Sequence, residues 1–198
     1  MKVSHVPYRV RRTLVWVRRW RRTRGFGVHS PTDYHFIRYV VNEHWPYYAY
    51  DTLKAQIPDI DRKTRKVCKL YFRIANHLQP KNILLIHMPA AAYEHYLRAG
   101  CQTALIMHHQ PGSSTLPQAD FIATTADDDM LPLIDDAMQH AGNGTLFIIN
   151  GIHKGRHSRR LWKTIRQHQR ATITFDLYYC GIIVINDTRS PQHYIVNY

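Results

Sequence analysis

The sequence predicts an α/β protein built on a mostly parallel, doubly wound sheet, and three observations support this prediction. Short uninterrupted apolar runs recur from residue 83 onward, as in strands buried on both faces. Helical candidates separate several of these runs. The chain of 198 residues is 44% hydrophobic and 12% aromatic, which is enough for one packed domain.

A local sequence pattern predicts each helix and each strand. The apolar runs predict parallel strands at 83–86, 104–107, 121–123 and 146–149. Apolar residues at helical spacing predict helices at 61–78, 91–99 and 130–141. Capping chemistry at Ser30-Pro31-Thr32-Asp33 predicts a helix that reaches Val41, and the aromatic segment 45–50 is expected to be a connector. Two further runs predict a C-terminal antiparallel hairpin, with a possible edge strand after it, at 172–175, 181–185 and 194–196.

Positive charge is the outlier of the composition. There are 27 Lys and Arg against 14 Asp and Glu, a formal net charge of +13. Nine basic residues lie between Lys2 and Arg24 with no acid among them, and seven more lie between Lys154 and Arg170. The rest of the chain is mildly acidic, so the net charge belongs to these two blocks. Such segregation favours contact with phosphate or anionic lipid, although a solvated or packed basic helix would give the same pattern.

The first basic block predicts an amphipathic helix from about Tyr8 to Arg22, ended by Gly25 and Gly27. Indole and guanidinium groups together favour stacked bases or a lipid interface, and the sequence does not choose between nucleic acid and an anionic membrane surface. We therefore divide the chain into a basic helical arm, 1–30, and a single domain, 31–198. The residues expected to bind the anionic partner, all within 2–24, are Arg11, Arg12, Trp16, Arg18, Arg19, Trp20, Arg21 and Arg22.

Several classes of protein are disfavoured. Three widely separated cysteines do not form a disulfide framework or a thiol-rich zinc module. No apolar run approaches the roughly 20 residues of a membrane span. The apolar run 14–17 is too short for the core of a signal peptide. We expect a cytoplasmic protein, peripheral to a membrane if its anionic partner is lipid.

Several strings resemble a bacterial methyltransferase-like family of the class I S-adenosylmethionine-dependent fold. They are Gly25-Phe26-Gly27-Val28-His29-Ser30-Pro31, the aromatic string 46–50, the helix 69–76, Ile152-His153, Trp162-Lys163-Thr164-Ile165 and the tail 172–182. This resemblance covers most of the chain. It implies a Rossmann-like methyltransferase fold with S-adenosylmethionine as cofactor.

The cofactor motifs of that family are degenerate here. The resemblance implies Glu-Leu-Gly-x-x-x-Gly after the first strand, but no glycine occurs between Gly27 and Gly100. An acid is implied after the second strand, where His108 follows instead, and an Asp-Asp pair after the later strand appears as Asn150-Gly151. The stretch between the second strand and Leu146 is also short for the family. The family-equivalent cofactor positions are His87, Met88, Ala90 and His108.

Histidines follow several predicted strands. The chain has 14, and His87, His108, His109 and His153 come directly after strands, at the edge where open α/β sheets bind ligands. If His153 and His157 lie on one helix, they share a face. His87, His153 and His157 are therefore candidate Zn²⁺ ligands, with oxygen donors from Asp127, Asp128 or Asp129, although strand-capping histidines would give the same pattern. Asp176 is expected to be a structural hydrogen-bond acceptor, and no catalytic residue is assigned.

The sequence thus predicts a methyltransferase-like pseudoenzyme that has lost S-adenosylmethionine binding and contacts an anionic partner through its arm. The alternatives are an active methyltransferase with an atypical cofactor loop, and a histidine-based metal-binding protein.

Overall fold

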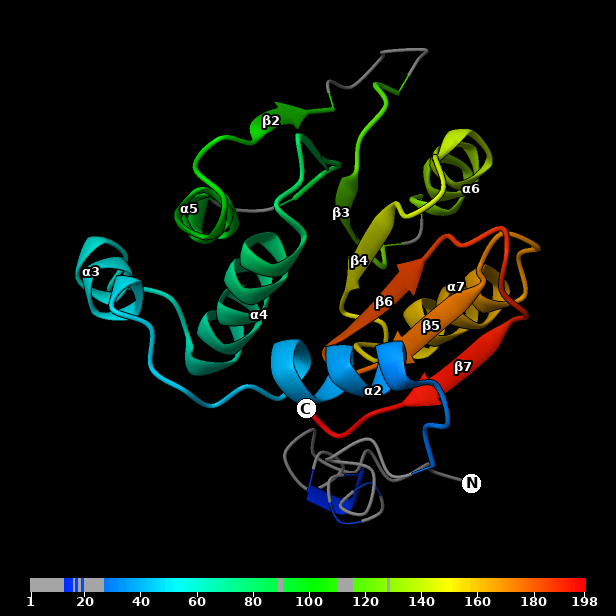
Figure 1. Ribbon diagram of the computed structural model, residues 1–198, viewed down its shortest axis with the longest axis horizontal. Helices are drawn as coiled ribbons and strands as arrows, with labels where there is room; N and C mark the ends of the chain where they lie inside the picture. Colours follow the sequence, from blue (N-terminus) through cyan, green and yellow to red (C-terminus); the bar gives the residue numbers. More distant parts are fainter. Residues whose placement is uncertain are drawn as a thin grey trace, which may run out of the picture.

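A seven-stranded sheet runs through the middle of the protein (Figure 1). The computed structural model describes residues 13–15, 17, 19, 27–88, 91–109, 116–127 and 129–198. The strand order is β2-β1-β3-β4-β6-β5-β7, and only β6 is antiparallel to its neighbours. The strands are β1 (Asn82–Leu85), β2 (Leu105–His108), β3 (Phe121–Thr125), β4 (Leu146–Asn150), β5 (Ile173–Asp176), β6 (Cys180–Val184) and β7 (Gln192–Ile195).

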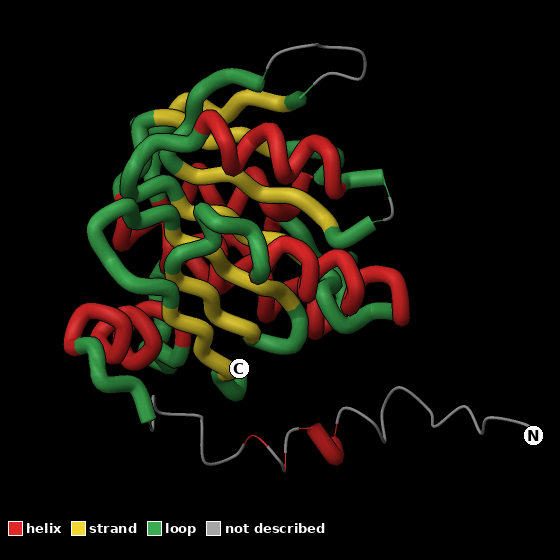
Figure 2. The backbone as a smooth tube through the Cα atoms, turned by 90° about the vertical axis from the view of Figure 1, so that its right-hand side faces the viewer, coloured by secondary structure: helices red, strands yellow, loops and turns green. Residues whose placement is uncertain are grey.

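Helices cover both faces of this sheet (Figures 1 and 2). They are α2 (Pro31–Phe36), the π-helical turn η2 (Ile37–Val41), α3 (Ala49–Gln56), α4 (Arg62–Leu78), α5 (Ala91–Gly100), α6 (Leu131–His140) and α7 (Arg156–Arg166). Buried residues of α4 and α5 form one hydrophobic core with the sheet, and those of α6 and α7 form a second core. The predicted doubly wound α/β fold is confirmed.

The parallel strands alternate between the two cores, which explains their uninterrupted apolar runs. In β1, Ile83 and Leu85 belong to the core under α4, whereas Leu84 belongs to the core under α6. Both sets are at most 3% exposed, so the run 83–85 has no polar position. The second apolar run behaves differently. It forms β2, an edge strand whose Leu105 is 59% exposed, so the expected burial of this strand was wrong.

Helix α4 forms where its capping residue and apolar face indicate. The side chain of Asp61 accepts hydrogen bonds from the backbone N–H groups of Lys63 and Thr64, and thereby caps the helix. Gly100, the last residue of α5, lies against α4 so closely that a Cβ there would stand 2.4 Å from the carbonyl oxygen of Phe72. The two helices can approach to this distance because the position has no side chain.

Helix α2 is tied to the last strand, β7, and to Arg189 before it through one buried carboxylate. Ser30 caps α2, and Pro31 is its first residue, as the capping signal predicts. Asp33 is 3% exposed and receives two charged hydrogen bonds from Arg189, at 2.7 and 2.6 Å. The Tyr194 hydroxyl of β7 donates a third hydrogen bond at 2.9 Å. These contacts, between residues 156 and 161 positions apart, hold α2 against the edge of the sheet.

Two segments, 45–56 and the arm helix 8–22, need to be set beside the sequence prediction. The aromatic connector 45–50 ends inside α3, a helix that was not expected. Most of the predicted arm helix, 8–22, lies outside the described residues. In the part of the chain that is described, no helix is long and apolar enough to cross a membrane.

Candidate functional site at the carboxyl edge of the sheet

The carboxyl ends of β1, β2, β3 and β4 meet at one edge of the sheet. Four neighbouring parallel strands bring together His87 and Asp127, which follow β1 and β3, and His108 and Asn150, the last residues of β2 and β4. Open α/β sheets bind their ligands there, because the loops that leave the strands diverge. The predicted meeting of these strand ends at one edge of the sheet is therefore confirmed.

The turn after β1 is occupied by side chains. His87 has a φ of 48°, a left-handed conformation that glycine adopts without strain. Its ring stacks on that of His109, which follows β2, with the ring centroids 5.9 Å apart. Met88 reaches across the edge, and its Sδ lies 3.8 Å from Nδ2 of Asn150 at the end of β4. The fourth cofactor-equivalent residue, Ala90, lies outside the described residues.

The turn after β2 holds an imidazole that is paired with a carboxylate. Nε2 of His108 lies 3.0 Å from Oε2 of Glu94, a residue of α5. Arg98 binds Oε1 of the same carboxylate at 2.9 and 2.7 Å. These hydrogen bonds, from Arg98 first and also from His108, lower the pKa of Glu94. The carboxylate beside β2 thus belongs to an ion-pair network on α5.

Beyond β4, the carboxylate of Asp176 accepts hydrogen bonds from three donors. Asp176 is 5% exposed at the end of β5, and its Oδ2 lies 2.8 Å from Nε2 of His153. Its Oδ1 accepts hydrogen bonds from Arg19 at 2.8 Å and from the backbone N–H of Tyr178 at 3.0 Å. Burial raises the pKa of Asp176, but the hydrogen bond and charge of His153, together with the charge of Arg19, outweigh it and hold the pKa far below its usual value.

This cluster agrees with one expectation and corrects another. Asp176 is a structural acceptor, as the sequence suggested. Arg19 was expected to face an anionic partner, but the side chain is only 13% exposed and is paired with a carboxylate of its own chain. The other seven arm residues assigned to that partner lie outside the described residues.

Between α4 and the ends of β3 and β4 lies a small pocket of about 220 Å³. Ligand pockets usually measure about 300 to 1,000 Å³, so this cavity suits a group smaller than a nucleoside cofactor. Its walls mix basic, hydroxyl, amide and acidic groups. The lining residues that carry them are Lys63, Thr64, Tyr93, Thr125, Asp127, Asn150, Lys154 and Tyr179.

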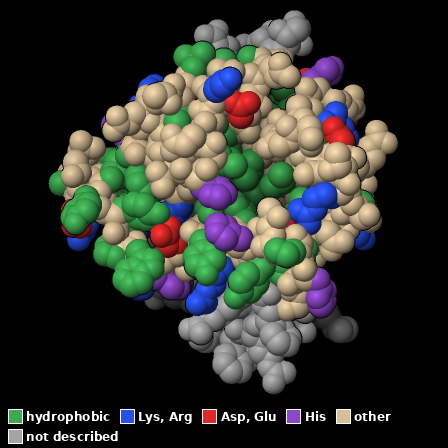
Figure 3. Space-filling model, viewed as in Figure 1, with side chains coloured by type: hydrophobic (Ala, Val, Ile, Leu, Met, Phe, Trp, Pro, Cys, Tyr) green, Lys and Arg blue, Asp and Glu red, His purple; other side chains and the backbone are tan. Residues whose placement is uncertain are grey.

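The candidate metal ligands do not come together. Among the residues that the structure describes, no group of three or more His, Cys, Asp or Glu side chains could hold a metal ion. His153 precedes α7, which begins at Arg156, so it does not share a helix face with His157. His153 is bound to Asp176, and His87 lies against His109. Apart from one adjacent pair, the histidines on the visible face are spread out (Figure 3).

Comparison with known proteins identifies the fold. No family model matches the sequence, and no curated protein matches it. Among solved structures, the SAH-bound methyltransferase PaMTH1 of Podospora anserina superposes with a TM-score of 0.56 at 11% identity, covering 74% of this chain and 92% of that chain. Cofactor-bound Rv0187 from MTB gives a TM-score of 0.51 at 13% identity, covering 79% and 97%. The fold is that of the class I methyltransferases.

Within this methyltransferase fold, some site residues could not be found from the sequence. Glu94 and Arg98 lie on a helix four residues apart, which is a common surface pair and gives no sign that His108 joins it. Arg19 and Asp176 are 157 positions apart, and no sequence pattern links them.

Proposed function

We propose that this chain is a non-catalytic protein of the methyltransferase fold that no longer binds S-adenosylmethionine and instead contacts an anionic partner through residues 2–24. The observation that carries the first half is the turn after β1. A cofactor of this fold approaches the backbone there, and glycine normally leaves the necessary room. In this chain the left-handed position is occupied by His87, which has an imidazole side chain where glycine would have none. The next side chain, Met88, extends over the edge to Asn150.

The turn after β2 supports the same proposal. A carboxylate at the end of this strand binds the two ribose hydroxyls in nucleotide-binding α/β folds. His108 stands at this position, and the neighbouring Glu94 is held by Arg98 and His108 through both of its oxygens. To bind a ribose, Glu94 would have to share oxygens that already accept from Arg98 and His108. Because both of these partners are more than half exposed, each pair is worth only about 0.5 kcal/mol and adds a small cost.

The experiment is a calorimetric titration of the full chain with S-adenosylmethionine and with S-adenosylhomocysteine. We expect no saturable binding tighter than about 1 mM, which corresponds to about 4 kcal/mol, whereas a site near 1 μM needs about 8 kcal/mol. The matched variant is His87→Gly with Met88→Gly, which restores room in the turn and is expected to bind better than the wild type. Saturable micromolar binding by the wild type would favour the alternative, an active methyltransferase with an atypical cofactor loop.

The second half of the proposal depends on charge. Residues 2–24 carry nine basic side chains and no acid, and the one of them that the structure describes, Arg19, is paired with Asp176. Helix α7 adds an exposed basic face made of Arg156, Arg160 and Lys163. The proposal includes a cytoplasmic location, at a membrane surface if the partner is lipid.

Binding to single-stranded RNA and to anionic vesicles, measured against salt, tests this half. With four to six phosphate contacts, the logarithm of RNA affinity should fall with the logarithm of salt with a slope of about −3 to −4. Removing residues 1–24 also removes the Arg19 contact, so a full-length variant with Arg11, Arg12, Arg21 and Arg22 changed to Gln is the better test. Arg19→Gln alone is its control. Equal binding by the four-residue variant and the wild type would exclude the arm as the contact.

A further inference from the structure

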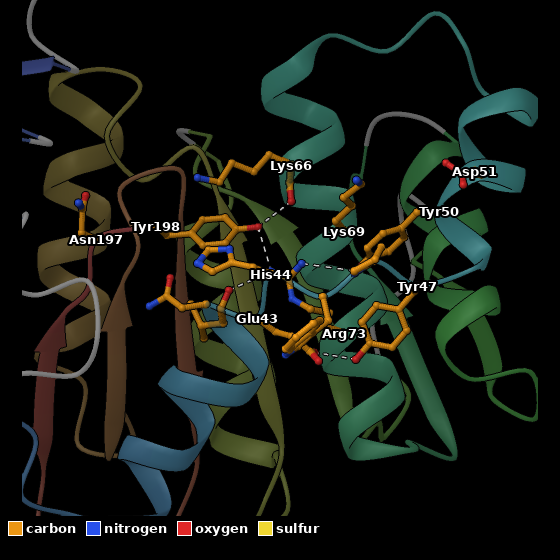
Figure 4. Close-up of a pocket in the computed structure, with 14 residues that line it drawn as sticks. Glu43, His44, Tyr47, Tyr50, Asp51, Lys66, Lys69, Arg73, Asn197 and Tyr198 are labelled. Carbon is orange, nitrogen blue, oxygen red and sulfur yellow. Dashed lines mark hydrogen bonds between the residues drawn. The ribbon is translucent and has the colours of Figure 1, made fainter.

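A second, larger pocket lies beside α4 and the residues that follow β7, and it shares no lining residue with the pocket between α4 and the ends of β3 and β4 (Figure 4). Its volume is about 470 Å³, within the usual range of small-molecule sites. Lys66, Lys69 and Arg73 follow one another along α4, with Tyr47 and Tyr50 on one side of them and Tyr198 on the other (Figure 4). The segment between η2 and α3 supplies the remaining wall, including Glu43 and Trp45.

Arg73 gives the pocket a buried positive charge. It is 6% exposed, and it donates from Nε to the carbonyl oxygen of Val40 at 2.7 Å and from Nη2 to that of Val41 at 2.9 Å. The Tyr50 and Tyr198 hydroxyls accept two longer hydrogen bonds, at 3.4 and 3.3 Å. No carboxylate pairs with this guanidinium among the described residues, so its charge is offset only by neutral oxygens. Buried charges are normally paired, and an anion near Arg73 would restore that balance.

Lysines next to Arg73 add to the positive charge. Nζ of Lys69 lies 4.4 Å from the ring centre of Tyr50, and Nζ of Lys66 lies 4.3 Å from that of Tyr198. Burial and then the charges of Arg73 and Arg65 lower the pKa of Lys69. Asp51, which also lines the pocket, acts on Lys69 in the opposite direction, so its carboxylate offsets part of the positive charge on this face of α4.

Two other groups in the pocket point to a ligand with a ring and polar substituents. Trp45 is 78% exposed, and an exposed indole at a pocket rim offers a flat stacking surface. Glu43 accepts a hydrogen bond from the Tyr47 hydroxyl at 2.6 Å through one oxygen, so the other oxygen can accept from a ligand hydroxyl.

We propose that this pocket binds a nucleoside monophosphate, with the phosphate between Lys66 and Lys69 near Arg73 and the base stacked on Trp45. Glu43 accepts a hydrogen bond from a sugar hydroxyl. None of its lining residues belongs to the turns after β1 and β2, so the proposal does not depend on whether the chain binds S-adenosylmethionine.

Calorimetric titration with uridine 5′-monophosphate tests the proposal, with uridine and inorganic phosphate as separate probes. Uracil is chosen because a residual cofactor site would favour adenine. We expect the monophosphate to bind at least about tenfold more tightly than either probe, since a stacked base and a charged phosphate contact each contribute about tenfold. Binding of inorganic phosphate as tight as that of the nucleotide would overturn the proposed base contact and, with it, the proposal.

Variants locate the bound nucleotide. Lys69→Gln removes a phosphate contact and Trp45→Ala removes the stacking surface, and each should weaken binding about tenfold. Lys81→Gln, an exposed lysine before β1, is the matched control and should bind like the wild type. Trp45 is so exposed that its loss should leave the thermal unfolding midpoint unchanged. Unchanged affinity in both pocket variants would place the nucleotide elsewhere and refute the assignment.

Discussion

Replacing Arg189 by Ala should destabilise the fold, because it leaves the buried carboxylate of Asp33 without its charged partner. The carboxylate of Asp33 is 4% exposed, and Arg189 is its only cationic partner among the described residues. Breaking a buried ion pair by removing one partner costs about 3–5 kcal/mol. The Arg189 side chain is 27% exposed, and the Tyr194 hydroxyl still donates to Asp33, so we reduce this to about 2–3 kcal/mol. For a chain of this size, the melting temperature should fall by about 5–10 °C.

Urea unfolding followed by circular dichroism at pH 7 measures this loss. Arg98→Ala is the matched control, because its side chain is 55% exposed and its pair with Glu94 should contribute no more than about 0.5 kcal/mol. In a double-mutant cycle with Asp33→Asn, part of the loss should be recovered, since the unpaired charge is then absent. If Arg189→Ala unfolds within about 0.5 kcal/mol of the wild type, or the cycle shows no coupling, the ion pair does not hold α2 to the sheet.

The same pair predicts a pH dependence. Burial raises the pKa of Asp33, but the hydrogen bonds from Arg189 and Tyr194 outweigh it, so the pKa is lowered in the folded protein. The stability that the carboxylate contributes is therefore complete above the unfolded pKa of about 3.9 and is lost as the pH falls through the folded pKa. The difference in unfolding free energy between the wild type and Arg189→Ala should be largest near neutral pH and shrink below about pH 4.

Three further predictions concern the site and its support. His87→Gly should be more stable than His87→Ala by about 1 kcal/mol in chemical unfolding, since both lack the ring and only Gly relieves the left-handed backbone; equal stability would show that the turn is unstrained. Gly181→Ala should lose about 1–3 kcal/mol or more in thermal unfolding, because its Cβ would lie 2.4 Å from the Trp162 ring, while Gly142→Ala, with no atom nearer than 3.9 Å, should match the wild type. Asp176→Asn should lose about 2–4 kcal/mol in urea unfolding because it leaves two buried donors without a charged acceptor, and a loss below about 0.5 kcal/mol would contradict that role.

Local sequence patterns predict most of this fold because the responsible forces act locally or repeat along the chain. Runs such as 146–149 have no polar position, which only a strand covered on both faces requires. Asp61 and Ser30 mark their helices through hydrogen bonds to residues two or three positions away. Helix α3 was missed because Pro46 and four neighbouring aromatic residues resemble a connector, and its packing depends on contacts with α4 and α5.

The candidate site was only partly predictable. The position of each strand end follows from the sequence, so the meeting of His87, His108 and Asn150 at one edge could be expected. The partner that each of these side chains contacts does not follow from the sequence. His153 binds Asp176, His108 binds Glu94, and both choices depend on partners far away in sequence. The second pocket was not predicted at all, because its basic residues occur singly within an ordinary amphipathic helix.

The exposed edge of β2 has a consequence for the behaviour of the protein at high concentration. Of the strands that the structure describes, only β1 pairs with β2, so the other side of β2 presents unpaired backbone N–H and C=O groups next to the exposed side chain of Leu105. Such an edge is a template for a strand from another copy of the chain, and the four-residue length of β2 limits how many hydrogen bonds it offers. Slow aggregation of concentrated solutions should therefore begin at β2, and a lysine in place of Leu105 should delay it while leaving the two cores intact.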